Sequence, residues 1–471
     1  MPIFDPELLA DWTGGNWNHL PCSLPIGFSI DARKINQGEV FVCISGHRDG
    51  HDFIKQAGER GASAALVDHF VDSSDLPQLK VSDTIQSFQE IARQHRNTFT
   101  GKVIGVTGSC GKTTTKEALG LLLPFSLSTE ANLNNYLGVP LTLTRISHEN
   151  HRFAVVEAGI NMRREMDGLT QMIHPEVVII TSIGDAHLQG LESNQIIAEE
   201  KIKLWTQSSD SALGIFPEEF SQYSCFSTAI NQKNHLMLLD SMPNSCEIAS
   251  QQAHYHYSTE TNRFGHSSTL TVWRHECPPL VVSLPSVSKG VARNLALSCL
   301  AAWKLGITDE EICERLPQYS PSALRGTRLA GRGCEYLVDC YNANPASVKD
   351  SAEFFTREFH GTPKLFVLAG MMELGKKSSE LHYQTGASIH IENLDRVILI
   401  GEQGGYMAEG LLSQGVREDQ IIVLHDNSSA RPLIEEFRGA VLFKGSRSYK
   451  LEELIPEWAV EKGERLQVLS C

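Results

Sequence analysis

Residues 105–117 read GVTGSCGKTTTKE, and they lie between the apolar run KVI at 102–104 and the apolar run ALGLLL at 118–123. Apolar runs on both sides of a glycine-rich segment predict a buried strand, a tight turn and a helix. This order of elements is typical of nucleotide-binding sites, because the helix begins with its N–H groups directed at the turn. The segment therefore predicts an α/β fold that carries a phosphate-binding loop.

The loop departs from the strict pattern GxxxxGK[ST], because Val106 stands at the first glycine position. The residues that carry the chemistry are nevertheless present, namely Gly108, Gly111, Lys112 and Thr113. Glycines let backbone N–H groups surround phosphate oxygens, the lysine reaches the terminal phosphates, and the threonine hydroxyl can ligate Mg²⁺. The alternative is a plain turn with a surface lysine, and the strand–turn–helix context favours the nucleotide.

An acid and a histidine follow the next two predicted strands. RFAVVEAGI at 152–160 places Glu157 at the end of a strand, and PEVVIITSIGDAH at 175–187 places His187 just beyond another. The carboxyl ends of parallel strands meet at one edge of a sheet, so both side chains can converge with Thr113 around metal-bound phosphates. Two alternatives stay open: a capping or solvated carboxylate, and a loop histidine without a role, since histidine is an unusual ligand for Mg²⁺.

Lys201 lies on an apolar helical stripe. In SNQIIAEEKIKLW at 193–205, helical spacing puts Ile197, Lys201, Leu204 and Trp205 on one face. From spacing alone we favour a lysine that snorkels, with its stem covering apolar surface and its charge in water. The alternative is a buried amine whose pKa is depressed, so that it can be modified or can meet phosphate.

The composition is that of a globular enzyme. The chain has 471 residues and 41 Lys and Arg against 56 Asp and Glu, and its net charge of −15 repels polyanions. Eleven scattered cysteines without a CxxC pair indicate neither a disulfide framework nor a zinc ribbon. Residues 1–12, MPIFDPELLADW, are acidic where a signal peptide is basic, and no apolar run approaches the ~18 residues of a membrane span. We expect a cytoplasmic protein that binds no nucleic acid and is not inserted in a membrane.

The length predicts about three domains of roughly 150 residues. Strands that alternate with helices after residue 100 predict a parallel sheet covered on both faces. The polar stretch at 93–101 is interpreted as a linker, and the segment 316–326, rich in Pro and Ser, as a second boundary. The expected domains are a small α/β unit at 1–100, the phosphate-loop domain at 101–324 and a further α/β unit at 325–471.

Two regions of these domains have distinct patterns. Residues 206–285 are less regular, and the alternating segment STLTVW within them predicts antiparallel strands and surface loops. The last domain has five apolar strand candidates, at 335–339, 364–370, 395–404, 420–425 and 440–445. Helical segments separate them, which again predicts a parallel sheet.

Seven segments occur in a fixed order along the chain: TGSCGKTTTKE, TEANLNNYLGVPLTL, VVEAGINMRREMDGL, TSIGDAHLQGLESNQIIAEEK, DCYNANPASV, VLAGMMELG and FKGSRSYKLEEL. Together they resemble the Mur ligases, and residues 28–67 are similar to the N-terminal domain of that family. The resemblance covers nearly the whole chain. Seven separate matches in order are far more specific than any one motif.

The resemblance implies an N-terminal domain for a UDP-sugar peptide, a central P-loop ATPase and a Rossmann-like C-terminal domain that closes over the site. The order of motifs is most similar to the members that use ATP and Mg²⁺ to join D-alanyl-D-alanine to UDP-N-acetylmuramoyl-tripeptide through an acyl phosphate, in peptidoglycan precursor synthesis. It also implies a monomer and a carbamylated Lys201, whose negative charge would position a metal ion.

The same resemblance implies roles for individual residues. The implied catalytic residues are Lys112, Glu157, His187 and Lys201. The implied metal ligands are Thr113, Glu157, His187 and carbamylated Lys201. The implied ATP contacts are Thr107, Gly108, Ser109, Cys110, Gly111, Lys112, Thr113, Thr114, Asn294, Arg328 and Asp339. The implied substrate contacts are Ser29, Asp31 and Arg33 on the uridine side, Asn135 near the phosphates, and Tyr341, Asn342, Asn344, Lys444, Ser446 and Arg447 near the acceptor dipeptide. Ordinary turn chemistry is an equal alternative for each of these taken singly, above all for YNANP.

Three positions depart from the family pattern. SKGVARN at 288–294 has Gly290 and Val291 where a His-Asn pair is usual, Ala32 replaces a serine, and Gly370 replaces an aspartate. These changes affect the expected nucleotide and uridine contacts but none of the implied catalytic residues.

Three rival functions stay open at this point. The first is another Mur ligase or a ligase similar to folylpolyglutamate synthase. The second is a nucleotide-dependent switch, against which the absence of an NKxD guanine-reading motif argues. The third is an inactive relative. The sequence does not determine whether the third peptide residue of the substrate is lysine or diaminopimelate.

Overall fold

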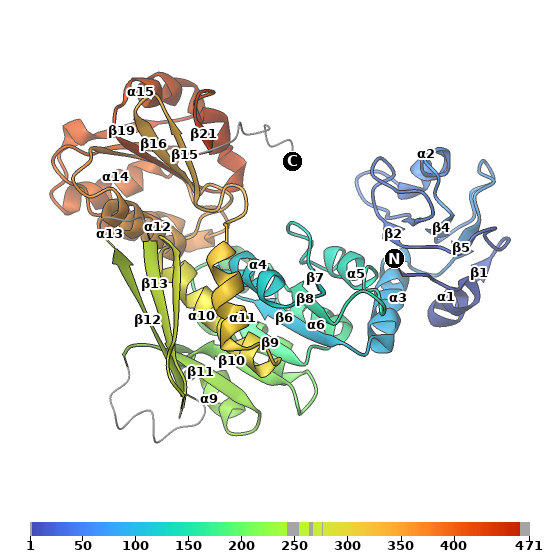
Figure 1. Ribbon diagram of the computed structural model, residues 1–471. Helices are drawn as coiled ribbons and strands as arrows, with labels where there is room; N and C mark the ends of the chain where they lie inside the picture. The colour runs from blue at the N-terminus through green and yellow to red at the C-terminus, as the bar shows by residue number, and fades with distance from the viewer. Residues whose placement is uncertain (1, 243–253, 263–266, 276, 462–471) are drawn as a thin grey trace.

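The computed structural model describes residues 2–242, 254–262, 267–275 and 277–461. Within these residues, three sheets form three successive α/β bodies, and the central body lies between the N-terminal and C-terminal ones (Figure 1). The fold class expected from the sequence is confirmed. The domain boundaries stay a prediction, and each falls between two sheets. No helix of the described residues has the length and apolar character needed to cross a bilayer.

The N-terminal body is a five-stranded sheet with three helices. In spatial order its strands are β1 (Asn16–Trp17), β5 (Gln78–Lys80), β4 (Ala64–Val67), β3 (Val40–Val42) and β2 (Phe28–Ser29). Its helices are α1 (Pro6–Thr13), α2 (Ile54–Glu59) and α3 (Thr84–Thr98). Strands β2 to β5 are parallel, so the segments that follow β2, β3 and β4 lie at one edge of the sheet.

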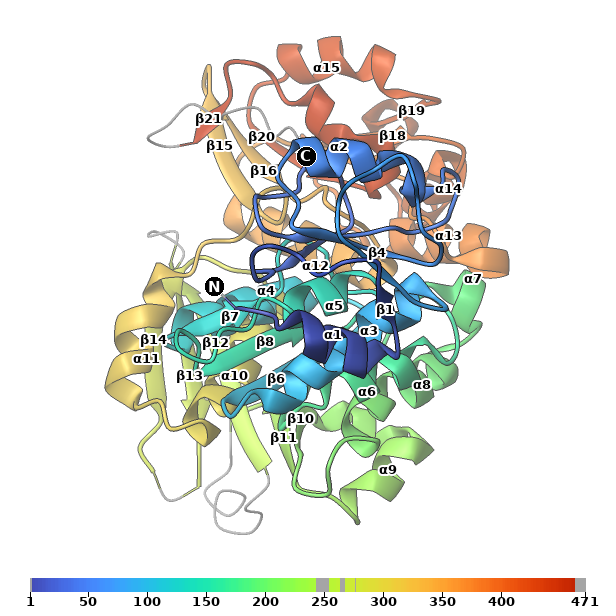
Figure 2. The ribbon, with the colours of Figure 1, turned by 90° about the vertical axis from the view of Figure 1, so that its right-hand side faces the viewer.

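The interpretation of residues 93–101 as a linker is wrong. Residues up to 98 form the end of α3, which lies against the central body (Figure 2). The buried Arg96 side chain donates hydrogen bonds to the carbonyls of Ile173 at 2.9 Å and His174 at 2.8 Å, and it pairs with Glu176 at 2.9 Å. The polar side chains of this segment therefore fasten the N-terminal body to the central one.

The central body contains a nine-stranded sheet. Its strands in spatial order are β14 (Leu280–Pro285), β13 (Ser267–Trp273), β12 (His254–Asn262), β11 (His235–Asp240), β10 (Leu213–Pro217), β9 (Val177–Ile180), β6 (Lys102–Thr107), β8 (Phe153–Glu157) and β7 (Ser126–Ser128). Seven strands, from β12 to β7, are parallel, whereas β13 and β14 are antiparallel. The expected antiparallel strands within 206–285 are thus confirmed.

Helices cover both faces of this sheet, as its apolar strands predict. The helices of the central body are α4 (Lys112–Leu122), α5 (Gly138–Leu143), α6 (Glu165–Ile173), α7 (Leu188–Leu191), α8 (Asn194–Thr206), α9 (Ser224–Ile230), α10 (Lys289–Lys304) and α11 (Asp309–Arg315). Val103 and Val156 belong to the core that includes α6 and α8, while their neighbours Ile104 and Val155 belong to the core that includes α4 and α10. Alternate residues of each strand thus supply the two cores.

The C-terminal body has seven strands, in the order β19 (Ile421–Leu424), β18 (Arg396–Ile400), β17 (Lys364–Ala369), β20 (Ala440–Lys444), β16 (Cys334–Val338), β15 (Thr327–Gly331) and β21 (Val460–Glu461). Its helices are α12 (Pro345–Glu358), α13 (Ser378–Ser388), α14 (Gly404–Ser413) and α15 (Ala430–Glu436). The five predicted strands, β16 to β20, are confirmed as a parallel sheet. The antiparallel strands β15 and β21 at its edge are short and partly polar, and the sequence pattern missed them.

Candidate active site

The phosphate-binding loop connects β6 to α4, as expected. Gly108 and Gly111 have φ values of 154° and 83°, which favour glycine, and a side chain at 108 would overlap the hydroxyl of Thr181. No side chain in the described part of the chain caps the start of α4. The first N–H groups of this helix therefore point at the loop, where an anion would complete them.

A neighbouring segment holds the loop in shape. The backbone N–H groups of Ser109 and Cys110 donate to the carbonyl and the hydroxyl of Ser182, at 2.9 and 2.7 Å. The Ser109 hydroxyl donates to the Gly184 carbonyl at 2.9 Å. Ser109 and Cys110 were expected to contact ATP, and their backbone groups already serve to anchor the loop.

Lys112 folds back over the loop that precedes it. Its ammonium donates to the Gly108 carbonyl at 2.8 Å. Burial lowers the pKa of Lys112, and the Arg325 charge acts in the same direction, while Glu157 opposes both. A half-buried cation with so little compensation provides a strong site for phosphate oxygens.

Glu157 is buried at the end of β8, where the sequence placed it. Its side chain accepts hydrogen bonds from the Thr113 hydroxyl at 3.2 Å and from the Asn134 amide at 2.8 Å. Its backbone N–H donates to the Thr129 hydroxyl at 2.9 Å. The sequence analysis named Asn135, which lines the same cleft and accepts backbone hydrogen bonds at the start of α5, and it missed Asn134. Adjacent asparagines in one motif gave no signal to separate them.

Lys201 does not snorkel, so the favoured interpretation of its helix is wrong. The residue is 1% exposed, and among the described residues its ammonium has no hydrogen bond or ion pair. Burial and the nearby Lys112 hold its pKa well below the usual range. The alternative from the sequence, a buried amine of depressed pKa, is the one that agrees with the structure.

His187 links the central and C-terminal bodies. Its Nδ1 pairs with Glu373, which the sequence analysis did not single out although it lies within the quoted run VLAGMMELG. Burial, Lys112 and Lys201 lower the pKa of His187, and the Glu373 carboxylate opposes them. The histidine thus lies close enough to both lysines for the three groups to influence one another.

The predicted residues of the C-terminal body bond mainly to one another. Asp339 accepts a hydrogen bond from Ser351 and pairs with Lys444 at 2.9 Å, and Lys444 also donates to the Asn342 carbonyl at 2.9 Å. Asn344 is the N-cap of α12, where its side chain accepts the Ser347 N–H at 2.8 Å.

Other residues of the C-terminal body also have charged or aromatic partners. Arg328 pairs with Glu358 at 2.6 Å, and Arg447 pairs with Glu452. The guanidinium of Arg325, which the sequence analysis missed, lies 4.0 Å from the centre of the Tyr341 ring.

These two walls enclose a cleft of about 1170 Å³ between the central and C-terminal bodies. Most predicted residues line it: Ser109, Cys110, Gly111, Lys112, Thr113, Thr114, Asn135, Glu157, His187, Asn294, Arg328, Asp339, Tyr341, Asn342, Asn344, Lys444, Ser446 and Arg447. Thr107, Gly108 and Lys201 do not line it. Ser29, Asp31 and Arg33 belong to the N-terminal body, where Asp31 and Arg33 form a two-bond ion pair at 2.9 Å.

Gly290, one of the departures from the family pattern, has a structural explanation. Asp350 of α12 accepts hydrogen bonds from the Ser288 hydroxyl at 2.6 Å and the Gly290 N–H at 3.0 Å, and a Cβ at 290 would lie 2.6 Å from its carboxylate. Burial raises the pKa of Asp350. A contact between two bodies therefore occupies this position. On the same helix, the side-chain oxygen of Asn294 is buried and has no hydrogen-bond partner among the residues that the structure describes.

The departure at Gly370 has a similar explanation. A Cβ at this position would lie 2.6 Å from the Tyr449 hydroxyl, and the same ring approaches Gly401. Tyr449 thus fills the space that a side chain at 370 would need.

The full chain matches known proteins in the same order of domains. Residues 27–96 match a model described as "Mur ligase family, catalytic domain", residues 106–302 the "Mur ligase middle domain", and residues 325–447 the "Mur ligase, glutamate ligase domain". The chain is 30% identical over 437 residues to the UDP-N-acetylmuramoyl-tripeptide--D-alanyl-D-alanine ligase of Escherichia coli, covering 91% of this chain and 92% of that protein. The chain belongs to the Mur ligase family.

Solved structures agree with the fold of this Mur ligase. A crystal structure of MurF from Acinetobacter baumannii superposes with a TM-score of 0.84 at 25% identity, covering 97% of this chain and 98% of that one. MurF of Thermotoga maritima in complex with ADP superposes with a TM-score of 0.75 at 25% identity, covering 91% of this chain and 96% of that one.

Proposed function

We propose that this Mur ligase uses ATP to join D-alanyl-D-alanine to UDP-N-acetylmuramoyl-tripeptide in peptidoglycan precursor synthesis. The observation that carries the proposal is the similarity over more than nine-tenths of the chain to a ligase of that name. The cleft adds chemical support, because a phosphate-binding loop and the Lys112 side chain line the same space as the polar face of the C-terminal body. A switch or an inactive relative would not need this combination.

The reaction needs an activated carboxylate, because a free carboxylate is a poor acylating agent. The tripeptide carboxylate attacks the γ-phosphorus of ATP, so that ADP leaves and an acyl phosphate forms. The amine of D-alanyl-D-alanine then attacks the acyl carbon, the C–O bond to phosphate breaks, and the amine loses a proton. Lys112 and the uncapped start of α4 would stabilise the negative charge that develops on the transferred group. Closure of the C-terminal body would exclude water from the acyl phosphate.

Mg²⁺ fits part of the predicted ligand set. Thr113 and Glu157 offer oxygen donors 3.2 Å apart beside the loop, which suit a hard cation. A bound Mg²⁺ would neutralise charge on the phosphates. The second ring nitrogen of His187 does not contact Glu373, and we propose it as a further metal ligand. Modified Lys201 completes the proposed set of metal ligands.

Lys201 fits the site only in a modified form. An ammonium would repel a metal ion and Lys112, whereas a neutral amine of low pKa can add to CO₂ and release a proton to form a carbamate anion. Its burial and the absence of a counter-ion among the described residues support this modification. A carbamate would supply the negative charge that the surrounding Lys112 and His187 lack.

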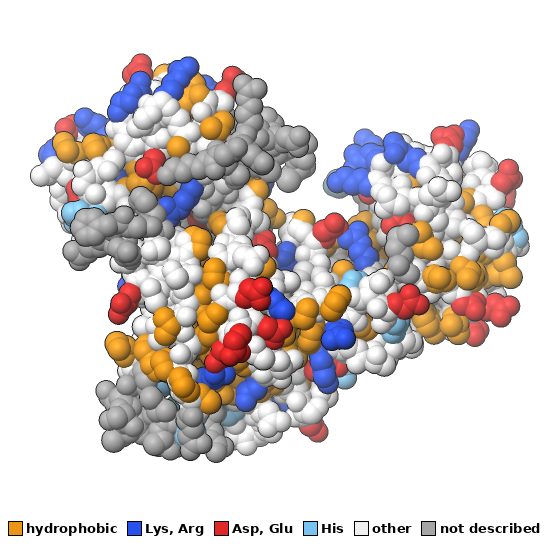
Figure 3. Space-filling model, in the orientation of Figure 1, with side chains coloured by type: hydrophobic (Ala, Val, Ile, Leu, Met, Phe, Trp, Pro, Cys, Tyr) orange, Lys and Arg blue, Asp and Glu red, His pale blue; other side chains and the backbone are white. Residues whose placement is uncertain are grey.

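The N-terminal body would hold the UDP part of the substrate. Figure 3 shows a broad hollow between the N-terminal and C-terminal bodies, with Lys and Arg side chains gathered on the N-terminal side. Basic side chains suit a diphosphate. We assign Ser29, Asp31 and Arg33 to the uridine side, and we place the enzyme in the cytoplasm as a monomer without nucleic-acid or membrane partners.

The decisive experiment measures ADP release with UDP-N-acetylmuramoyl-tripeptide as the acceptor of phosphate. We expect D-alanyl-D-alanine to stimulate release and the product to gain the mass of the dipeptide less one water. Parallel reactions with single amino acids, including glutamate with a folate, are the controls. Stimulation by a single amino acid alone would assign the chain to another Mur ligase activity or to the folylpolyglutamate type. Comparing tripeptides that end in lysine or in diaminopimelate would settle the third residue.

A further inference from the structure

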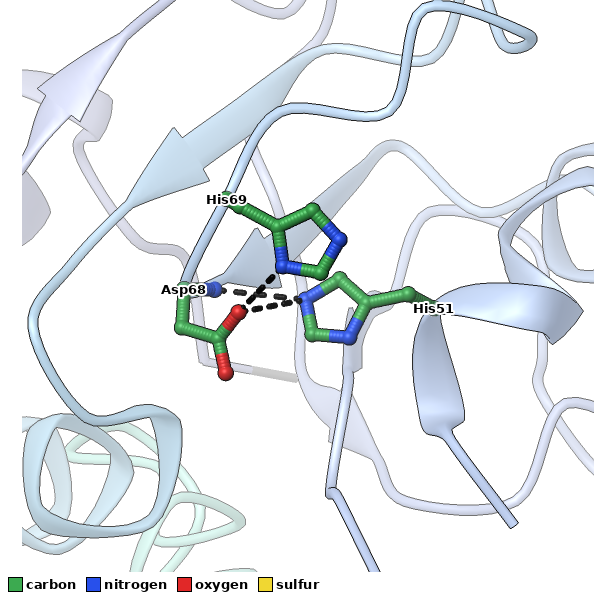
Figure 4. Close-up of side chains that lie close together, drawn as sticks. All are labelled: His51, Asp68 and His69. Carbon is green, nitrogen blue, oxygen red and sulfur yellow. Dashed lines mark hydrogen bonds and ion pairs between the residues drawn. The ribbon is translucent and has the colours of Figure 1, made fainter.

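Three side chains with metal-binding atoms meet in the N-terminal body, on segments that follow β3 and β4. His51, Asp68 and His69 place one ligand atom each within 4.8 Å of one another (Figure 4). His51 Nε2 lies 3.4 Å and His69 Nδ1 lies 2.5 Å from the same oxygen of Asp68. The two imidazole rings stack with their centres 4.1 Å apart.

The nitrogen of His51 that faces the cluster is unprotonated, and a metal ion there would replace the long hydrogen bond that its lone pair accepts from the Asp68 N–H. His51 Nδ1 lies 2.6 Å from the Asp49 carboxylate, and His51 Nε2 accepts the Asp68 backbone N–H at 3.3 Å. Nδ1 therefore holds the proton and Nε2 is unprotonated. A carboxylate that holds the far nitrogen of an imidazole is the arrangement common around protein metal ions. His51 is buried, so its ring is fixed in this orientation.

We propose that His51, Asp68 and His69 bind a divalent transition-metal ion of the Zn²⁺ type. Two imidazoles and one carboxylate suit zinc, whereas Mg²⁺, the ion proposed for the phosphate site, prefers oxygen ligands and water. Donors about 2.1 Å from a tetrahedral zinc are roughly 3.4 Å apart, a separation that His51 and Asp68 already have. His69 must withdraw from Asp68 by about 1 Å for such a geometry. Its side chain is 58% exposed and free to do so.

The surroundings leave room for the ion to enter. Asp68 and His69 are partly exposed, so water can occupy the fourth ligand position. The ion would tie the segment after β3 to the segment after β4. Both lie at the same edge of the sheet as Ser29, which is the last residue of β2 and one of the proposed uridine contacts. Occupancy would thus stabilise the edge of the N-terminal body that faces the UDP-linked substrate.

The test uses the full chain without a histidine tag, in excess Mg²⁺ to saturate oxygen-ligand sites. Zn²⁺ binding is measured by equilibrium dialysis, and Co²⁺ is titrated as a spectroscopic probe of tetrahedral coordination. We expect one ion per chain and at least ~10-fold weaker binding in His69→Ala and in Asp68→Asn. Asp49→Asn keeps an acceptor for the His51 N–H but loses its charge, and a ~10-fold loss is expected.

The matched control is His19→Ala, which removes an exposed histidine from the same body. It should bind Zn²⁺ as the wild type does, and Zn²⁺ should raise the melting temperature of both proteins but not that of His69→Ala. Circular dichroism verifies that each variant is folded. Equal binding by the wild type and His69→Ala, or no 1:1 binding by the wild type, would overturn the proposal.

Discussion

The two walls of the cleft differ in how their polar groups are satisfied. On the central side, among the described residues, Lys201 is buried without a partner although it does not line the cleft, the Lys112 ammonium hydrogen-bonds to one loop carbonyl, and no side chain caps α4. On the C-terminal wall, Asp339 and Lys444 pair with each other, and Asn344 caps a helix. Buried polar groups are normally paired, so those left without partners mark where a ligand must bring its own charges. The paired groups of the other wall fix its shape.

The largest effect should come from removing the phosphate cation. Lys112→Ala should lower turnover on the order of 10³-fold, because stabilisation of the charge on the transferred phosphoryl group is lost. The melting temperature should change little, since within the described part of the chain the ammonium hydrogen-bonds to the Gly108 carbonyl alone. Lys304→Ala, at an exposed helical position, is the control. Turnover within twofold of the wild type would remove Lys112 from the mechanism.

The second prediction separates activity from stability at Lys201. Lys201→Met should lower turnover about 10²-fold or more, as expected for loss of a metal-positioning charge. It should also stabilise the protein in bicarbonate-depleted buffer by about 1–3 kcal/mol, because a methionine avoids burying an amine without a partner.

The pH dependence of stability sharpens this prediction. The pKa of Lys201 is depressed in the folded chain, so between that value and the ordinary value of 10.5 only the unfolded chain holds the proton. Stability should therefore rise with pH through this window in the wild type. The slope should be smaller in Lys201→Met, as thermal melts at several pH values would reveal. Equal slopes in both proteins would contradict a neutral buried amine.

The accuracy of the predictions made from the sequence also differs between the two sides of the cleft. Around the central sheet, strand ends predicted where Glu157 and His187 lie, because parallel topology brings those ends to one edge. Helical spacing put Lys201 on the apolar face, but spacing cannot tell a snorkelling lysine from a buried one. That choice depends on what packs over the helix, which only the folded chain provides.

In the C-terminal body, the sequence predicted the strands but not the residues with which the polar side chains pair. Glu373 and Asp350 are paired with residues at least 60 positions away, so no local pattern marks them. The linker interpretation of 93–101 failed for the same reason, because Arg96 finds its acceptors on α6 and the segment after it. Contacts between bodies were therefore the least predictable part of the site.

Breaking the pair of His187 and Glu373, which joins the two sides of the cleft, should have a smaller effect on turnover. The Glu373 carboxylate raises the pKa of His187. Glu373→Gln removes this carboxylate, so the pKa of His187 should fall further below its usual value. NMR titration of the histidine measures the shift. Turnover should fall about tenfold, since replacing a charged hydrogen bond between the two bodies by a neutral one typically costs about 1–1.5 kcal/mol. Glu380→Gln, an exposed change on the same body, should alter neither quantity.

The smallest effect on turnover should come from the C-terminal side of the cleft, where the polar side chains are already paired. Asn344→Ala removes the cap of α12 and should destabilise the protein by about 1 kcal/mol, measured by denaturant unfolding. Asn344→Ser can still cap the helix and should restore most of this stability. Both variants should keep turnover and the KM for D-alanyl-D-alanine within about threefold of the wild type, because the side chain is committed to the helix. A large rise in this KM in the stable Asn344→Ser variant would show instead that the asparagine contacts the dipeptide, and the contrast between the two walls would then be one of degree.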